Sequence, residues 1–299
     1  MATTKTPEEI RSLLSGPVNS IPTPFRGDGA VDWQGVRRII EVGIAGGSAV
    51  SLLTYGDSQF DFLSDEEVEQ LTRCLAEQVA GRVFTVAATR KWPDERAVAF
   101  ARRCRDLGID VLMVLPPDHA SPKGRIRHYL SVAEVMPVML VGCPPFDVLD
   151  ALADAPNICC FKEDGTVEYA PEAMQRYAHR WKFVTGGGLW RNLTQWPWSP
   201  AFFCYFSSFA PHIAQRYWMA YQEGDARAAG ELVRTVEMPF AALAAGFAGG
   251  FQALWRAALE LNGVAERYLR APAVSPTAEE VAAAAPAIER LELITRPLG

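Results

Sequence analysis

The chain has 299 residues, of which 49% are hydrophobic and 21% are charged, and its formal net charge is −6. This composition is typical of a globular protein with a large core, and it argues against nucleic acid or an anionic membrane as a partner. No window approaches the run of about 20 apolar residues that a membrane-spanning helix needs. The N-terminal segment has no apolar signal core, so we expect a cytoplasmic location.

Short apolar runs alternate with amphipathic, helix-like stretches along most of the chain. One stretch opens at Ser64 and has Glu67 three residues later, which is the pattern of an N-terminal capping box. Another opens at Pro93 and stops at Gly108. The apolar runs are Pro17–Ile21, Ala49–Leu53, Val83–Ala87, Val111–Leu115, Val138–Val141, Ile158–Phe161, Phe183–Thr185 and Ala201–Cys204.

Eight strand-like runs separated by helices predict an α/β fold with a parallel sheet and right-handed crossovers. Eight such units fit a closed (β/α)8 TIM barrel, for which about 250 residues is typical. An open doubly wound sheet is the alternative. That fold usually has a glycine-rich first turn, whereas this chain has Pro22-Thr23-Pro24-Phe25 there, and we therefore favour the barrel.

The chain changes character after Gly224. Residues 225–299 contain no strand-like run and instead have alanine-rich helical stretches separated by segments with glycine and proline. We therefore predict a barrel over residues 1–224 and a C-terminal helical region over 225–299, which we expect to pack at a subunit interface. The helical stretches are Asp225–Ala245, Phe251–Asn262 and Thr277–Leu293.

Lys162 is the most informative residue of the sequence. It follows the apolar run Ile158–Phe161 and precedes a polar turn, the pattern of a buried strand whose last side chain points into a site. Burial disfavours the ammonium form of a lysine and lowers its pKa, and a neutral lysine attacks ketones to form a Schiff base. The alternative is a strand-end lysine whose amine reaches solvent.

The active site of a TIM barrel lies in the loops that follow the strands, so the residues there are candidates. The turn Thr54-Tyr55-Gly56 can aim backbone N–H groups and a hydroxyl at a carboxylate, although it could instead be a capped turn before the next helix. His119 is a candidate acid–base, or an exposed loop histidine.

A run of three glycines follows the seventh strand-like run. Its first residue, Gly186, permits close approach of the backbone to a ligand. A phosphate site is the alternative there, but no basic residue accompanies the glycines until Arg191. Phe203, near the end of the eighth run, completes the residues that we assign to substrate binding, with Thr54, Tyr55, Gly56 and Gly186.

No motif of the sequence indicates a metal or a nucleotide cofactor. The chain has no H-E-x-x-H and no cysteine–histidine or carboxylate–histidine cluster. It has no G-x-G-x-x-G after a strand and no G-x-x-x-x-G-K. We therefore expect neither a metal nor an organic cofactor.

In this order and spacing, several motifs resemble those of the dihydrodipicolinate synthase / N-acetylneuraminate lyase family of pyruvate-type class I aldolases. The resemblance covers essentially the whole chain. The motifs are Val18-Asn19-Ser20-Ile21-Pro22-Thr23-Pro24-Phe25, similar to the family's opening strand and T-P-F turn; Thr54-Tyr55-Gly56-Asp57-Ser58 with Leu63-Ser64-Asp65-Glu66-Glu67, similar to G-T-T-G-E-S and L-S-x-E-E; Leu115-Pro116-Pro117-Asp118-His119, in the position of P-P-Y-Y; Phe161-Lys162-Glu163-Asp164, similar to the I-K-[DE] strand; and Arg270-Ala271-Pro272, similar to the late R-x-P.

The resemblance implies an imine between Lys162 and a small 2-oxo acid. It implies that Thr54 and the Tyr55 amide hold the carboxylate of that acid. It also implies a homotetramer or a homodimer of barrels, and a reaction that needs no metal or organic cofactor.

One departure from the family pattern concerns proton transfer. The family's fifth strand normally ends in Tyr-Asn-x-Pro, whose phenol relays protons to and from the imine, whereas Val141 stands in that tyrosine's place here. Valine cannot transfer a proton. We therefore expect another group to do so, with Tyr55, His119 and Asp57 as candidates in that order.

Other departures concern the second substrate. Pro145 and Phe146 replace the arginine of the lysine-pathway synthases, and Gly187, Gly188 and Leu189 replace the acidic residues of the sialic acid lyases. We therefore expect neither of these two activities. Aromatic residues near the predicted site favour a more apolar second substrate or product.

These observations together predict a class I, Schiff-base lyase of the aldolase or dehydratase type that acts on a 2-oxo acid through Lys162, with Tyr55 or His119 supplying protons. A catalytically impaired barrel of the same family that only binds 2-oxo acids is the alternative, since losing a general acid–base typically lowers a rate about 10²–10⁴-fold. A further alternative is a barrel that binds phosphate and has an unrelated chemistry.

Overall fold

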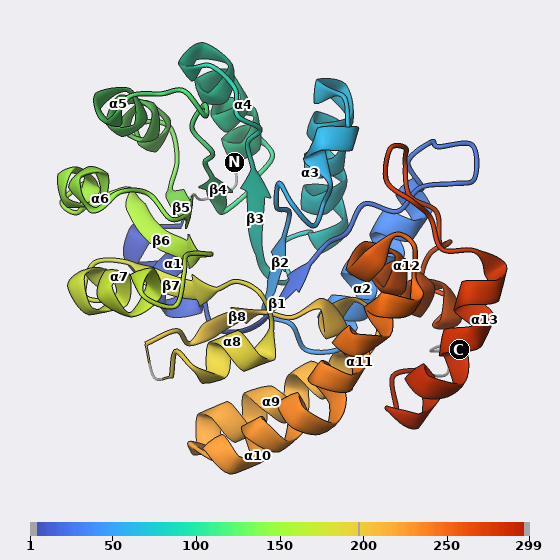
Figure 1. The fold of residues 1–299 in the computed structure, drawn as a ribbon. Coiled ribbons are helices and arrows are strands. Elements are labelled where there is room, and N and C mark those ends of the chain that lie inside the picture. The colour runs from blue at the N-terminus through green and yellow to red at the C-terminus, as the bar shows by residue number, and fades with distance from the viewer. Residues whose placement is uncertain (1–4, 197, 296–299) are drawn as a thin grey trace.

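The computed structural model describes residues 5–196 and 198–295, and in this part of the chain eight parallel strands close into a barrel (Figure 1). Each strand pairs with the next in chain order, and the last pairs with the first. The predicted (β/α)8 fold is therefore confirmed, and the strand bounds agree closely with the apolar runs. The strands are β1 (Gly16–Ser20), β2 (Val50–Leu52), β3 (Phe84–Ala88), β4 (Val111–Met113), β5 (Val138–Gly142), β6 (Ile158–Glu163), β7 (Lys182–Thr185) and β8 (Ala201–Phe203).

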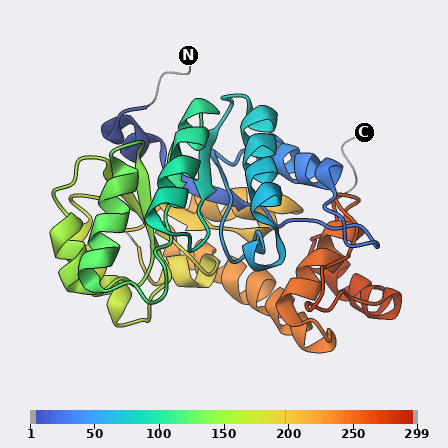
Figure 2. The same ribbon diagram turned by 90° about the horizontal axis from the view of Figure 1, so that it is seen from above.

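A helix follows each strand and covers the outside of the barrel, and a further helix, α1 (Pro7–Leu13), lies beside β6 (Figures 1 and 2). Among the described residues, no helix is long and apolar enough to cross a membrane. The helices that follow the strands are α2 (Trp33–Ala45), α3 (Asp65–Val79) after the short η1 (Phe60–Phe62), α4 (Asp94–Asp106), α5 (Pro122–Ala133), α6 (Phe146–Leu152), α7 (Tyr169–Tyr177), α8 (Leu189–Leu193) and, after η2 (Tyr205–Ser208), α9 (Pro211–Glu223).

The predicted capping box is confirmed at the start of α3. The Glu67 amide donates to the Ser64 hydroxyl at 3.2 Å, and the Ser64 amide donates to the Glu67 carboxylate at 2.9 Å. Two amides that lack partners inside the helix are thus satisfied. This cap fixes the exit of the loop that follows β2.

The C-terminal stretch is helical, as predicted, but it is not regular. Between α10 (Ala226–Leu232) and α11 (Met238–Ala242) the chain forms a π-helical turn, η3 (Val233–Glu237), in which the Met238 amide bonds to the Val233 carbonyl. Pro239 follows at once, and a proline ring clashes with the carbonyl four residues before it in an α-helix, which a widened turn relieves. The chain ends in η4 (Leu243–Gly246), α12 (Gly250–Leu261) and α13 (Ala278–Arg290).

These C-terminal helices lie at one side of the barrel (Figures 1 and 2), and residues of α11 and α12 line the cavity described below. The division of the chain at residue 224 stays a prediction.

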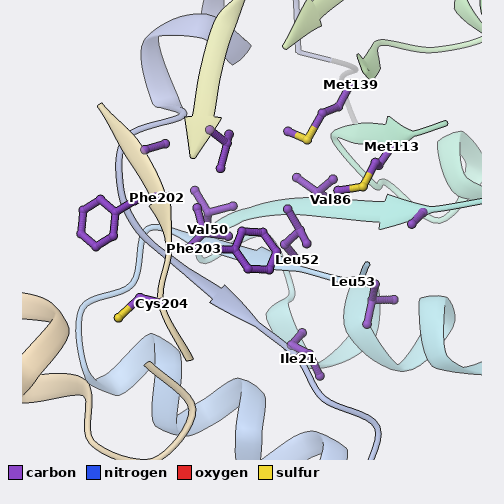
Figure 3. Packing of buried hydrophobic residues seen from close by; sticks show 14 of the residues in the cluster. Ile21, Val50, Leu52, Leu53, Val86, Met113, Met139, Phe202, Phe203 and Cys204 are labelled. Atoms are coloured by element: carbon purple, nitrogen blue, oxygen red, sulfur yellow. The ribbon is translucent and has the colours of Figure 1, made fainter. Parts of the chain in front are cut away.

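Alternate side chains of the strands fill the barrel. Figure 3 shows Phe203 pointing toward Val50 and Leu52, whereas its neighbour Phe202 points the other way. All four side chains are buried. This alternation follows from the two-residue period of a strand, and it decides which residues of β5, β6 and β8 face the interior.

Candidate active site

A cavity of about 1160 Å³ lies at the carboxyl ends of the strands, where TIM-barrel enzymes have their active sites. Strand-end loops form its floor, and residues from η3, α11 and α12 form one wall. No group of three or more His, Cys, Asp or Glu residues among those described is arranged to hold a metal ion. The residues of the lining used below are Thr54, Tyr55, Gly56, Asp57, Lys91, Asp118, Arg125, Val141, Lys162, Asp164, Gly188, Trp190, Phe203, Tyr205, Glu237, Phe251 and Trp255.

Lys162, near the end of β6, is 6% exposed and lines this cavity. Its Nζ donates to Asp164 Oδ1 at 2.6 Å and also bonds to Oδ2. The same Nζ lies 4.5 Å from the centre of the Phe203 ring. The lysine therefore does not reach out to bulk solvent. Its amine is held in the cavity by one carboxylate and one aromatic face.

The Asp164 carboxylate has room because residue 186 is a glycine. A Cβ at Gly186 would lie 1.9 Å from Asp164 Oδ1, closer than two such atoms can approach. The backbone of Gly186 has no positive φ, so the requirement for glycine here is one of space. The Asp164 side chain is 36% exposed, which leaves part of it open to the cavity.

A second carboxylate, Asp57, also lines the cavity. Its Oδ2 accepts a hydrogen bond from the Ser20 hydroxyl at 2.7 Å. Burial raises the pKa of Asp57, and the nearby Asp164 charge raises it further, while the Ser20 hydrogen bond and the Lys162 ammonium lower it. Asp57 and Asp164 thus have different environments although both interact with Lys162.

The turn after β2 is held in place by the Ser58 side chain. The Ser58 hydroxyl accepts from the Thr54 amide at 3.1 Å and donates to the Ile21 carbonyl at 2.6 Å, which ties the turn to the first strand. Within the described chain, the hydrogen bonds of the turn leave the Tyr55 and Gly56 amides without an acceptor. Thr54, Tyr55 and Gly56 all line the cavity, so the two amides are available to an anion that approaches this turn.

Tyr55 and His119, the residues expected to supply protons, are less favourably placed for that role. The Tyr55 hydroxyl donates to Asp61, and burial, with this carboxylate, raises the pKa of Tyr55 to about 12. His119 is exposed and does not line the cavity, whereas its neighbour Asp118 does. Val141, in the place of the family's relay tyrosine, lines the cavity.

Glu237 brings a carboxylate to the cavity wall from the π-helical turn. It is 3% exposed, and it accepts hydrogen bonds from the amides of Leu189 at 2.6 Å and Trp190 at 2.7 Å. The Tyr205 hydroxyl lies 3.4 Å from Oε1. Burial raises the pKa of Glu237 to about 7 although these donors lower it. A Cβ at Gly188 would lie 2.4 Å from Glu237 Oε1, so this glycine too makes room for a carboxylate.

The structure therefore brings most of the predicted residues to one cavity. Lys162, Thr54, Tyr55, Gly56 and Phe203 line it. Gly186 lies against Asp164 behind the lining, and its backbone is not part of the lining itself.

Sequence reasoning did not single out Asp164 or Glu237. Asp164 had a signal, because it stands two residues after Lys162, and alternate residues of a strand point to the same side. Glu237 had none, because its contacts to the amides of Leu189 and Trp190 join segments far apart in the sequence.

The fold is thus a closed (β/α)8 barrel with a buried lysine at the floor of its cavity. In a barrel of this class, the lysine amine is placed where it can react with a substrate carbonyl. The family model described as the dihydrodipicolinate synthetase family matches residues 13–291. The chain belongs to this family.

Individual relatives span more than one reaction. The chain is 29% identical to a probable 5-dehydro-4-deoxyglucarate dehydratase from Streptomyces avermitilis, over 93% of this chain and 94% of that one. It is 34% identical to a 4-hydroxy-tetrahydrodipicolinate synthase from Xanthomonas axonopodis pv. citri, over 50% of this chain and 53% of that one. The relatives thus include a dehydratase and a synthase.

Two solved structures share the fold. A dihydrodipicolinate synthase from Bacillus clausii has a TM-score of 0.83 at 20% identity, covering 95% of this chain and 100% of that one. An N-acetylneuraminate lyase from Mycoplasma synoviae has a TM-score of 0.80 at 21% identity, covering 94% and 98%.

Proposed function

We propose that the protein is a Schiff-base lyase of the aldolase or dehydratase type that acts on a 2-oxo acid. The observation that carries this proposal is the position of Lys162: its amine is buried at the floor of a large cavity and is in contact with a carboxylate. A purely structural lysine has no need of such a cavity. Family membership supports the same kind of reaction.

In the proposed reaction, the Lys162 amine attacks the ketone of the substrate, and water leaves as the iminium forms. The Thr54 hydroxyl and the amides of Tyr55 and Gly56 bind the neighbouring carboxylate and orient the ketone toward Nζ. In an aldol cleavage, the bond between the third and fourth carbons breaks and its electron pair forms the enamine, while the hydroxyl on the fourth carbon loses a proton and becomes a carbonyl; the enamine then takes a proton at carbon. In a dehydration, a proton first leaves the third carbon to form the enamine, which then expels the hydroxyl of the fourth carbon as water. Hydrolysis of the imine returns the free lysine.

The full-length similarity to a 5-dehydro-4-deoxyglucarate dehydratase favours dehydration, in which a carbon–oxygen bond breaks. A sugar acid with a second carboxylate needs a cation at the far end of the cavity. Arg125 lines the cavity and donates from Nε and Nη2 to the carbonyls of Ala120 and Asp118, which leaves its positive charge available to an anion.

The aromatic side chains in the cavity wall favour a different kind of substrate, one whose second half is apolar. Trp190, Tyr205, Phe251 and Trp255 line the cavity beside Glu237 and offer apolar faces to a substrate. We therefore keep the proposal of an apolar or aromatic substituent, and we propose that the protein is neither an authentic dihydrodipicolinate synthase nor a sialic acid lyase.

A panel of substrates tests the proposal. The protein is incubated with 5-dehydro-4-deoxyglucarate and with 4-hydroxy-2-oxo acids that carry aliphatic or aromatic substituents, and products are followed by NMR. We expect turnover of at least one compound, and its loss in Lys162→Arg. Turnover that persists in Lys162→Arg contradicts the lyase mechanism, and a strict preference for the polyhydroxylated compound contradicts the apolar substituent.

A 2-oxo-acid-binding barrel with little turnover is a second candidate, and Val141 is the observation that favours it. The side chain in the place of the relay tyrosine carries no proton. Exchange of the methyl protons of pyruvate in heavy water separates the candidates, because an enzyme that forms an enamine exchanges these protons and a pure binder does not.

We also propose a homodimer or a homotetramer and a cytoplasmic location, on the grounds of the family resemblance. Light scattering on the purified protein tests the oligomer, and a monomer would contradict it.

A further inference from the structure

We infer that Asp164 is the catalytic residue that transfers protons at Lys162, in the role that the family pattern gives to a tyrosine and that Val141 cannot fill. This inference rests on the imine chemistry proposed above. It assigns a role to a residue that the sequence motifs alone leave without one.

The first observation is direct contact with the reacting atom. Both oxygens of Asp164 are within hydrogen-bond distance of Lys162 Nζ, with Oδ1 at 2.6 Å. A general acid–base must lie within about 2.6–3.2 Å of the atom whose proton it moves. Asp164 meets this requirement before any substrate binds.

The second observation is that the carboxylate faces the place of reaction. Asp164 lines the cavity and is 36% exposed, so a substrate carbon bonded to Nζ would be close to it. Gly186 keeps this position open, because any larger residue would occupy the site of Oδ1. A carboxylate that served only to neutralise a buried lysine would not need to be accessible from the cavity.

The third observation is that the other candidates are held elsewhere. The Tyr55 hydroxyl donates to Asp61, and His119 lies outside the cavity lining. Asp57 lines the cavity, but its Oδ2 accepts from Ser20, and no ion pair joins it to Lys162 in the described structure. Among these groups, Asp164 is the one in contact with the amine.

Asp164 alone can carry out all the proton transfers of imine formation. At rest, Lys162 is an ammonium and Asp164 a carboxylate. Asp164 takes one proton, the neutral amine forms a bond to the ketone carbon, and the carbonyl electron pair moves to oxygen. Asp164 then delivers that proton to the oxygen and carries a second one across from nitrogen, so that the oxygen leaves as water. The third proton stays on the iminium nitrogen, and Asp164 is again a carboxylate.

The same carboxylate can take the next proton. It removes a proton from the carbon beside the iminium, and the electron pair of that bond forms the neutral enamine. In heavy water, Asp164 returns deuterium to the carbon when the step reverses. The exchange of pyruvate methyl protons is therefore a direct measure of this transfer.

The experiment compares four proteins in heavy water with saturating pyruvate: the wild type, Asp164→Asn, Asp164→Ser and Asp154→Asn. Proton NMR gives the exchange rate, and borohydride reduction followed by intact mass gives the fraction of protein present as imine. Asp154 is the matched control, because it pairs with Arg180 at 2.8 Å as Asp164 pairs with Lys162, but it is 85% exposed and does not line the cavity.

We expect the exchange rate, divided by the fraction of protein trapped as imine, to fall about 10²–10⁴-fold in both Asp164 variants and to stay at the wild-type value in Asp154→Asn. If Asp164→Asn does not fold, Asp164→Ser still provides a protein without the carboxylate for the comparison. Wild-type exchange in an Asp164 variant that still forms the adduct overturns the role of Asp164 and leaves the proposed function intact. Absence of an adduct in the wild type overturns the proposed function itself.

Discussion

Val141 and Lys162 are register partners on the neighbouring strands β5 and β6. Partners on adjacent strands point to the same side of a barrel, so the valine side chain lies beside the stem of the lysine and lines the same cavity. The register partner of Lys162 on β5 is thus a residue that cannot transfer a proton. The structure places a carboxylate, Asp164, against the same amine from just after the end of β6.

Restoring a phenol at residue 141 should compensate for the loss of Asp164. In the Asp164→Asn protein, we expect Val141→Tyr to raise pyruvate methyl exchange at least about tenfold, because a hydroxyl then lies beside the amine. Val141→Phe in the same background is the matched control, with the ring but no hydroxyl. Equal exchange in the tyrosine and phenylalanine proteins would show that the hydroxyl contributes nothing.

Gly186→Ala should move the Asp164 carboxylate away from the amine. The added Cβ would lie 1.9 Å from Oδ1, so the side chain must rotate. We expect pyruvate exchange to fall about tenfold or more, by the loss of proton transfer, while the protein stays folded. Gly246→Ala is the control, because its Cβ meets nothing within 4 Å and it has no positive φ. Unchanged exchange in Gly186→Ala would contradict the geometry.

Thr54→Val should weaken the binding of 2-oxo acids. Its hydroxyl is assigned to the substrate carboxylate, and loss of such a hydrogen bond costs about 0.5–1.5 kcal/mol, or up to about tenfold in affinity. We expect the pyruvate concentration for half-maximal imine trapping to rise accordingly. Thr54→Ser keeps the hydroxyl and should remain near the wild type. An unchanged value for the valine variant would place the carboxylate elsewhere.

Glu237 should make the stability of the protein depend on pH. Burial raises its pKa from 4.5 to about 7, so the stability that its proton contributes is fully present below about pH 4.5 and is lost as pH rises through 7. Between pH 5 and pH 8 the free energy of unfolding of the wild type should fall about 1–3 kcal/mol more than that of Glu237→Gln. Urea unfolding at the two pH values measures this difference, and parallel losses would contradict it.

Much of the fold was predictable because the apolar runs that mark the strands are local. The run ending at Phe161 predicted β6, and the position of Lys162 after it predicted an inward-pointing amine. The capping box at Ser64 was equally local, and it is confirmed. In contrast, the π-helical turn before Pro239 depends on a clash within the helix that the alanine-rich composition does not reveal.

The candidate site was less predictable, because side-chain partners are set by tertiary contacts. Tyr55 ranked first as a proton source by its position after β2, yet its hydroxyl bonds to Asp61 of the same loop. The expectation for Lys162 considered burial alone, whereas Asp164 forms an ion pair with it. Glu237 reaches the cavity through contacts with Leu189 and Trp190 that no local pattern encodes.

The central claim is that Lys162 forms an imine with a 2-oxo acid, and borohydride trapping with pyruvate followed by peptide mass spectrometry tests it most directly. Lys91 provides the internal comparison, because it lines the same cavity but pairs with Asp118. We predict a reduced pyruvate adduct on the peptide that contains Lys162, its loss in Lys162→Arg and its persistence in Lys91→Arg. No adduct on Lys162 with pyruvate or larger 2-oxo acids, or equal labelling of Lys91, would contradict the account.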